Sequence, residues 1–103
     1  MAAILIYTTT PTEEKAKIIA KHLLEKRFIA CANIFPIQSI YRWENKITED
    51  KEFVLLLKTL EKNYRKVKEE IEKIHPYKIP CIAKINISPN KKYSNWLEKE
   101  IKN

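Results

Sequence analysis

Apolar residues follow first a strand-like and then a helix-like pattern in the N-terminal third of the chain. Residues 2–9 are apolar and β-branched, which predicts a first strand that is buried on both faces. Thr12 is a good helix N-cap, and after it apolar residues recur at intervals of three and four. We therefore predict a first helix that extends to about Phe28.

The middle of the chain predicts a long hairpin. Residues 29–43 are rich in Ile, Phe, Tyr and Trp, and they predict a strand that is irregular around Pro36. Residues 47–59 contain an uninterrupted apolar run and predict the returning strand. In the turn at 44–46, Asn45 is the natural substitute for a glycine, because asparagine tolerates a positive φ.

The C-terminal part repeats the order of helix and strand. Apolar residues at three- and four-residue intervals over 64–74 predict a second helix, and the helix ends at His75 because a residue before proline is disfavoured in a helix. Alternate apolar positions over 79–87 predict a fourth strand. A short C-terminal helix is predicted by four remaining apolar residues: Tyr93, Trp96, Leu97 and Ile101.

The predicted order is β-α-β-β-α-β followed by a last helix. This is the order of an α+β, ferredoxin-like sandwich, here with a long hairpin between the second and third strands. The chain has 103 residues, of which 45% are hydrophobic, and this suits one modest core. Because no linker or repeat interrupts the pattern, we assign residues 1–103 to a single domain.

Composition excludes several classes of nucleotide-binding protein. The chain has no glycine, so it lacks glycine-rich phosphate loops, dinucleotide fingerprints and the RNP1 motif of RNA-binding domains. The net charge of +7 would suit a nucleic-acid partner, but opposite charges four residues apart indicate solvated helix faces instead. These pairs are Glu61–Arg65, Glu69–Lys73 and Glu98–Lys102. We therefore expect no nucleic-acid partner.

The chain carries no signal for a membrane or for export. No apolar run approaches the ~18 residues that a membrane-spanning helix needs. The N-terminus leads into the first strand without a positively charged region or a cleavage-site pattern. We expect a cytoplasmic protein without a membrane partner.

The reactive residue types do not form an enzyme-like pattern. Cys31 and Cys81 are far apart in sequence and match neither a disulfide framework nor a zinc site, and we expect Cys31 to be a buried, inert thiol. The clustered carboxylates Glu49, Asp50 and Glu52 alternate between the two faces of a strand, so they need not converge on a substrate. We expect no enzymatic activity.

Five segments resemble the CutA divalent-cation-tolerance family. The family patterns are EKRLAACVNI, SIYRWxGKI, EDKE…LxKT, HPYExP and YxxWL. The corresponding segments here are residues 25–34, 39–47, 49–59, 75–80 and 93–97. They lie in the same order and cover almost the whole chain, so the resemblance is specific.

The resemblance implies a homotrimer whose long hairpins reach across to neighbouring subunits. It also implies a binding or scaffold protein associated with divalent metal ion tolerance, with copper or another divalent ion as the metal. Tyr41, Arg42 and Trp43 on this hairpin have two interpretations that remain open. They bind a planar or anionic ligand, or they pack between subunits, which we favour.

His75 and Cys81 are the candidate metal ligands, because an imidazole and a thiolate favour Cu(I) or zinc. In family members that bind copper, a cysteine aligns with Thr8 and a second histidine aligns with Ile74, so that design is incomplete here. Lys78 also replaces a glutamate of the family pattern. Weak metal binding is the expectation, and a local hydrogen bond at the helix end is the alternative role of His75.

Two other functions fit the same fold. Trimeric nitrogen-regulatory proteins share the architecture and sense small molecules, but their phosphate contacts use glycine. An acylphosphatase-like enzyme needs an Arg and an Asn at a loop after the first strand, and residues 8–11 (Thr-Thr-Thr-Pro) supply neither. The sensor is the principal alternative.

Overall fold

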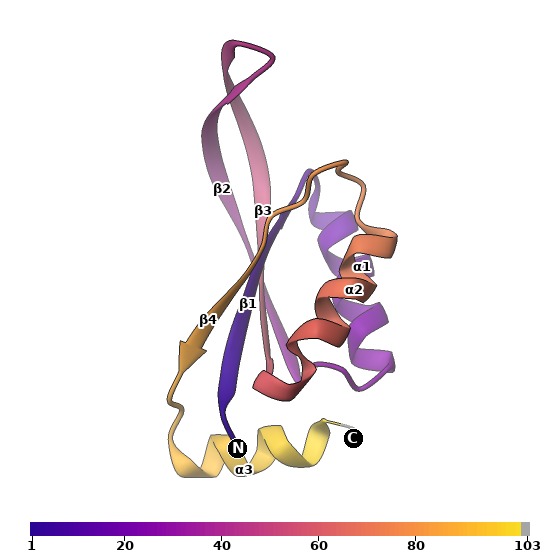
Figure 1. Ribbon diagram of the computed structural model, residues 1–103, viewed down its shortest axis with the longest axis vertical. Helices are drawn as coiled ribbons and strands as arrows, with labels where there is room; N and C mark the ends of the chain where they lie inside the picture. Colours follow the sequence, from indigo (N-terminus) through magenta and orange to yellow (C-terminus); the bar gives the residue numbers. More distant parts are fainter. Residues whose placement is uncertain (102–103) are drawn as a thin grey trace.

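The computed structural model describes residues 1–101 and contains one four-stranded antiparallel sheet with two helices packed on one face (Figure 1). The strand order across the sheet is β2-β3-β1-β4. The elements are β1 (Ala3–Thr10), α1 (Glu13–Glu25), β2 (Cys31–Trp43), β3 (Lys46–Leu60), the 3₁₀ helix η1 (Glu61–Asn63), α2 (Tyr64–Ile74), β4 (Ile82–Ile87) and α3 (Lys91–Glu100). The α+β, ferredoxin-like class and the predicted order of elements are confirmed.

Local chemistry explains both ends of α1. Thr12 is the N-cap, and its hydroxyl accepts a hydrogen bond from the backbone N–H three residues later at 3.1 Å. At the other end, the N–H of Phe28 bonds to the carbonyl of Leu23 while Arg27 adopts a φ of 59°. This is a Schellman motif with arginine in the usual glycine position. It ends the helix at Glu25, so the predicted end near Phe28 is wrong.

The β2–β3 hairpin extends well beyond the other strands (Figure 1). Its tip pairs Trp43 with Lys46, whereas β1 accompanies β3 only as far as Phe53. The two turn residues Glu44 and Asn45 have φ values of 48° and 64°. A type I′ turn needs positive φ at both central positions, and its twist matches that of the strands. The prediction for Asn45 is confirmed.

The main core lies between the sheet and helices α1 and α2. Its fully buried side chains come from all of these elements: Ile4 and Ile6 of β1, Leu55 and Leu57 of β3, Ile19 and Leu23 of α1, and Val67 and Ile71 of α2. A second cluster forms where Leu97 of α3 packs on Ala3 and Leu60. These two clusters hold the base of the hairpin in place.

The opposite side of the sheet is apolar but incompletely covered within the described chain. We call it the open face, and the strand register assigns to it alternate residues that include Leu5, Tyr7, Phe35, Leu56 and Ile85. Leu5 and Tyr7 are only half-buried, and Ile85 is 45% exposed. In the single chain, the predicted burial of the first strand is therefore complete only on the helix side.

β4 is shorter than predicted. It begins at Ile82 rather than at residue 79, and Ile79 is 73% exposed in the preceding loop. Pro80 in that loop has no N–H to donate to a neighbouring strand. The alternate apolar residues of this segment, Ala83 and Ile85, lie on the open face rather than in the main core.

Charged residues on the helices have other partners than those predicted. Glu61 pairs with Lys84 of β4 at 2.8 Å, and Glu69 pairs with Arg65 at 3.2 Å. The third predicted pair, Glu98–Lys102, includes a residue outside the described range. Among residues 1–101, no helix combines the length and the hydropathy needed to cross a membrane.

Candidate functional site

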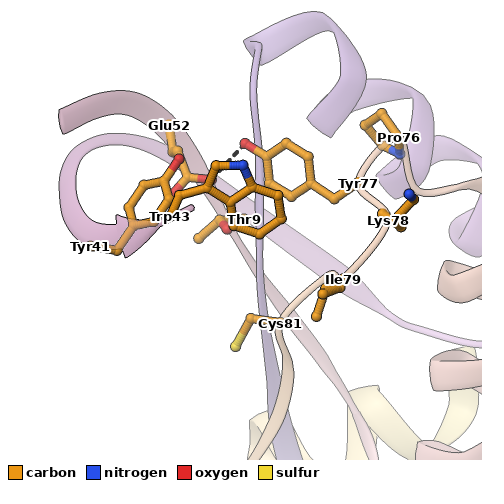
Figure 2. A pocket seen from close by; sticks show the side chains of 9 residues that line it. All are labelled: Thr9, Tyr41, Trp43, Glu52, Pro76, Tyr77, Lys78, Ile79 and Cys81. Carbon is orange, nitrogen blue, oxygen red and sulfur yellow. Dashed lines mark hydrogen bonds between the residues drawn. The ribbon is translucent and has the colours of Figure 1, made fainter. Parts of the chain in front are cut away.

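A cavity of about 480 Å³ lies between the protruding β2–β3 hairpin and the loop that joins α2 to β4 (Figure 2). Its volume falls within the ~300–1,000 Å³ typical of small-molecule sites. The lining residues are Thr9, Tyr41, Trp43, Glu52, Pro76, Tyr77, Lys78, Ile79 and Cys81. The hairpin and the loop are far apart in sequence, so only the tertiary fold creates this cavity.

A buried carboxylate lies in the wall of the cavity. Glu52 of β3 is only 9% exposed, and Tyr77 Oη donates a hydrogen bond to its Oε2 atom at 2.6 Å. Burial and this hydrogen bond raise the pKa of the Tyr77 phenol. Tyr77 therefore remains a neutral donor and ties the loop to the hairpin.

Two further aromatic residues come from β2. Tyr41 and Trp43 are 41% and 50% exposed, and the alternation of the strand places them on the same face. Tyr41 donates a hydrogen bond to Asp50 on β3, and this bond raises the pKa of the phenol. Both aromatic side chains line the cavity mouth, while Arg42 between them is absent from its lining.

His75 positions the loop rather than lining the cavity. Its Nε2–H donates to the carbonyl of Thr9 at 2.8 Å, and its Nδ1 accepts from the N–H of Tyr77 at 3.0 Å. Burial lowers the pKa of the imidazole, which suits this neutral, fully hydrogen-bonded ring. The local hydrogen bond considered as an alternative role is confirmed, and the metal role stays a prediction.

Cys81 is an exposed free thiol in the cavity lining. Cys31 is also free, but it is half-buried rather than fully buried as expected. Thr8, which the resemblance aligns with a cysteine of copper-binding members, is buried, and its hydroxyl has no hydrogen-bond partner among residues 1–101. Within residues 1–101, no three His, Cys, Asp or Glu side chains are grouped closely enough to hold a metal ion.

Sequence reasoning found some of these residues and missed others. Tyr41, Trp43 and Cys81 were singled out and line one cavity. Glu52 lies within a matched segment, but no pattern in the sequence indicated its burial. Its partner Tyr77 was visible in the His-Pro-Tyr motif, but no local pattern indicates that a loop residue contacts a strand 25 positions away.

The fold and the cavity define a class of protein: a small ferredoxin-like domain with a protruding hairpin and an aromatic pocket beside it. The model of the CutA1 divalent ion tolerance protein family matches residues 4–100. The chain belongs to this family.

Individual members of this family are similar to the chain over nearly its whole length. The divalent-cation tolerance protein CutA of Thermotoga maritima is 43% identical over 99 residues, which cover 95% of this chain and 98% of that one. The crystal structure of CutA1 from Pyrococcus horikoshii matches with a TM-score of 0.94 and 44% identity, over 97% and 99% of the two chains. The structure of a periplasmic divalent cation tolerance protein CutA from Archaeoglobus fulgidus matches with a TM-score of 0.94 and 40% identity, over 97% and 99%.

Proposed function

We propose that the chain forms a homotrimer that acts as a binding or scaffold protein in the tolerance and response to divalent metal ions, without catalysing a reaction. The family membership supports the link to divalent cations. The single observation that supports self-association is the open face. Apolar surface of this kind on a small domain is typical of an interface.

The arrangement of strands supports a closed ring. β2 and β4 lie at opposite edges of the sheet, and the distal half of the hairpin has no other strand beside it. When two different edges of identical subunits join, each subunit contacts two neighbours in the same way, and a ring of fixed number forms where the rotation between subunits closes. The resemblance to trimeric family members supports three as that number.

Sedimentation equilibrium tests the assembly. The chain has a mass of 12.3 kDa, so a homotrimer sediments as a single species of about three times that mass at micromolar concentration. A monomer under these conditions contradicts the proposal.

The proposed metal role rests on His75 and Cys81, with copper as the metal. Cys81 is exposed and supplies a thiol, but His75 must give up one of its two hydrogen bonds to bind a metal. We therefore propose weak binding of a soft ion such as Cu(I).

Competition for Cu(I) against a chelator, in wild type, Cys81→Ser and His75→Ala, tests this role. We expect Cys81→Ser to lose most of the affinity. Equal affinity in all three proteins would remove both residues from any metal role.

The second candidate function is a small-molecule sensor, similar in architecture to the trimeric nitrogen-regulatory proteins. The cavity beside the hairpin supports it, because a ligand there contacts both the hairpin and the α2–β4 loop. Limited proteolysis of the hairpin with and without a panel of metabolites tests it. Protection by a metabolite favours the sensor, and no protection favours the scaffold.

We propose the cytoplasm as the compartment. Both cysteines are free thiols, which suits a reducing environment. The description of the Archaeoglobus relative as periplasmic makes a direct test worthwhile, by fractionation of the native host.

A further inference from the structure

The cavity between the hairpin and the α2–β4 loop has walls of an unusual composition. Aromatic rings of Tyr41, Trp43 and Tyr77 lie around it, and the carboxylate of Glu52 lies behind them (Figure 2). Aromatic faces carry negative electrostatic potential and attract cations. The cavity therefore combines three weakly negative walls with one formal negative charge.

Glu52 is the decisive residue, because a buried carboxylate is normally paired with a cation. The ion pairs found within residues 1–101 do not include it. Its hydrogen-bond partner, the phenol of Tyr77, is neutral. The burial of this negative charge therefore has an uncompensated free-energy cost, which a cation bound in the cavity would reduce.

We propose that this cavity is a binding site for an organic ammonium ion, with Tyr41, Trp43 and Tyr77 as an aromatic cage and Glu52 as the counter-charge. The proposal goes beyond the function in metal tolerance, and it rests on the proposed homotrimer leaving this end of the open face, where Tyr41, Trp43 and Glu52 lie, accessible to solvent.

The chemistry selects an ammonium over other ligands. An anion would be repelled by Glu52. A metal ion needs several ligands, and no group of three suitable side chains occurs within residues 1–101. An ammonium needs only aromatic faces and one nearby negative charge.

Lys78 is the one cationic residue in the lining. Its side chain is exposed and lies at the far end of the cavity from Tyr41 (Figure 2). Water and salt screen its charge there, so it weakens but does not cancel the attraction of Glu52. Pro76 and Ile79 add apolar contacts that suit the methyl groups of a substituted ammonium.

A fluorescence titration with choline tests the proposal. The background variant is Trp96→Phe, in which Trp43 is the sole tryptophan and reports directly on the cavity. The matched control ligand is 3,3-dimethylbutan-1-ol, which has the shape of choline without its charge. We expect choline to give a saturable change and to bind at least about tenfold more tightly than the alcohol, as cation–π pairing with a buried counter-charge implies.

Three variants separate the effect of charge from an effect on the fold. Glu52→Gln should weaken choline by at least about tenfold, while Glu49→Gln, on the same strand but outside this cavity, should leave binding unchanged. Lys78→Gln removes the exposed like charge and should tighten binding at low salt. Sedimentation of each variant shows whether the assembly is retained, so a loss of binding through dissociation is recognised.

The proposal is overturned if choline and the alcohol bind equally, if neither binds, or if the two glutamate variants behave alike. It is also overturned if Lys78→Gln leaves choline affinity unchanged or lowers it. A cationic side chain of a second copy in the cavity would appear as no choline binding together with a Glu52→Gln variant that dissociates. That result would assign Glu52 to the subunit interface.

Discussion

At the scale of single residues, two buried threonines of β1 differ in their hydrogen bonding. Thr8 and Thr10 both lie on β1 with fully buried side chains facing the helices. Thr10 Oγ1 donates to the carbonyl of Thr12 at 2.9 Å, whereas the hydroxyl of Thr8 has no partner in the described part of the chain. An unpaired buried hydroxyl is costly because it has lost its hydrogen bonds to water.

We predict that Thr8→Val stabilises the protein by about 1 kcal/mol, since valine has the same shape without the unpaired hydroxyl. Thr10→Val is the control and should destabilise by about 1 kcal/mol, because it removes a formed hydrogen bond. Denaturant unfolding of the two variants measures both values. If Thr8→Val lowered the stability more than Thr10→Val, the Thr8 hydroxyl would have a hydrogen-bond partner in solution.

At the scale of elements, the absence of glycine places ordinary residues in left-handed backbone conformations. Arg27 ends α1 in this way, and Glu44 and Asn45 form the hairpin turn. This conformation is higher in energy for a residue with a Cβ atom, because the Cβ approaches the following carbonyl oxygen, whereas glycine has no Cβ.

We predict that Arg27→Gly is neutral or stabilises by up to about 1 kcal/mol, because glycine is the preferred residue at this position of a Schellman motif. Lys26→Gly is the control, since Lys26 has right-handed helical geometry and glycine there should cost about 0.5–1 kcal/mol. Thermal unfolding distinguishes the two. A loss of stability in Arg27→Gly larger than in Lys26→Gly would contradict the argument.

The hairpin and α3 give a second prediction at this scale. Trp43 lies on the protruding hairpin, whereas Trp96 packs beside Tyr93 within α3, with ring centres 5.3 Å apart. We predict that Trp43→Ala weakens the assembly more than Trp96→Ala. Removing an aromatic side chain from an interface makes stability more dependent on protein concentration.

Unfolding midpoints at several protein concentrations measure this difference. A stronger concentration dependence for Trp96→Ala than for Trp43→Ala would show that the hairpin is not the principal contact between subunits.

At the scale of the whole molecule, His75 links global stability to pH. Its pKa in the folded protein is lowered by burial below the value of about 6.5 expected in an unfolded chain. Below pH 6.5 the unfolded chain therefore binds more protons than the folded one. The stabilisation from the neutral ring is present above this pH and is lost as the pH falls towards the folded value.

We predict that the free energy of unfolding decreases between pH 7 and pH 5 and that His75→Gln decreases less over this range. The variant His22→Gln measures how much of the decrease comes from the other histidine, whose Nε2 lies 2.7 Å from Oε1 of Glu70. Denaturant titrations at several pH values provide the measurement. If wild type and His75→Gln differ by a constant amount at every pH, His75 does not couple stability to protonation.

Much of the fold was predictable because its signals are local. The helical periodicity of 64–74, the alternation over 79–87 and the turn at Asn45 each depend on residues within one element, and the structure confirms an element at each place. The boundaries were less predictable. The early end of α1 depends on a left-handed arginine, and the late start of β4 depends on which strand lies beside it.

The sequence by itself determined the order of elements, the fold class and the family, because periodicity, turn chemistry and the five matched segments each depend only on residues close together in sequence. Only the tertiary structure decided the site. The burial of Glu52, its bond to Tyr77 and the aromatic cavity exist because the α2–β4 loop packs against the hairpin. The same is true of the open face, whose apolar residues could be assigned to one side only when the register of β1, β3 and β4 was known. Contacts between segments distant in sequence leave no periodic signal, and therefore geometry alone reveals them.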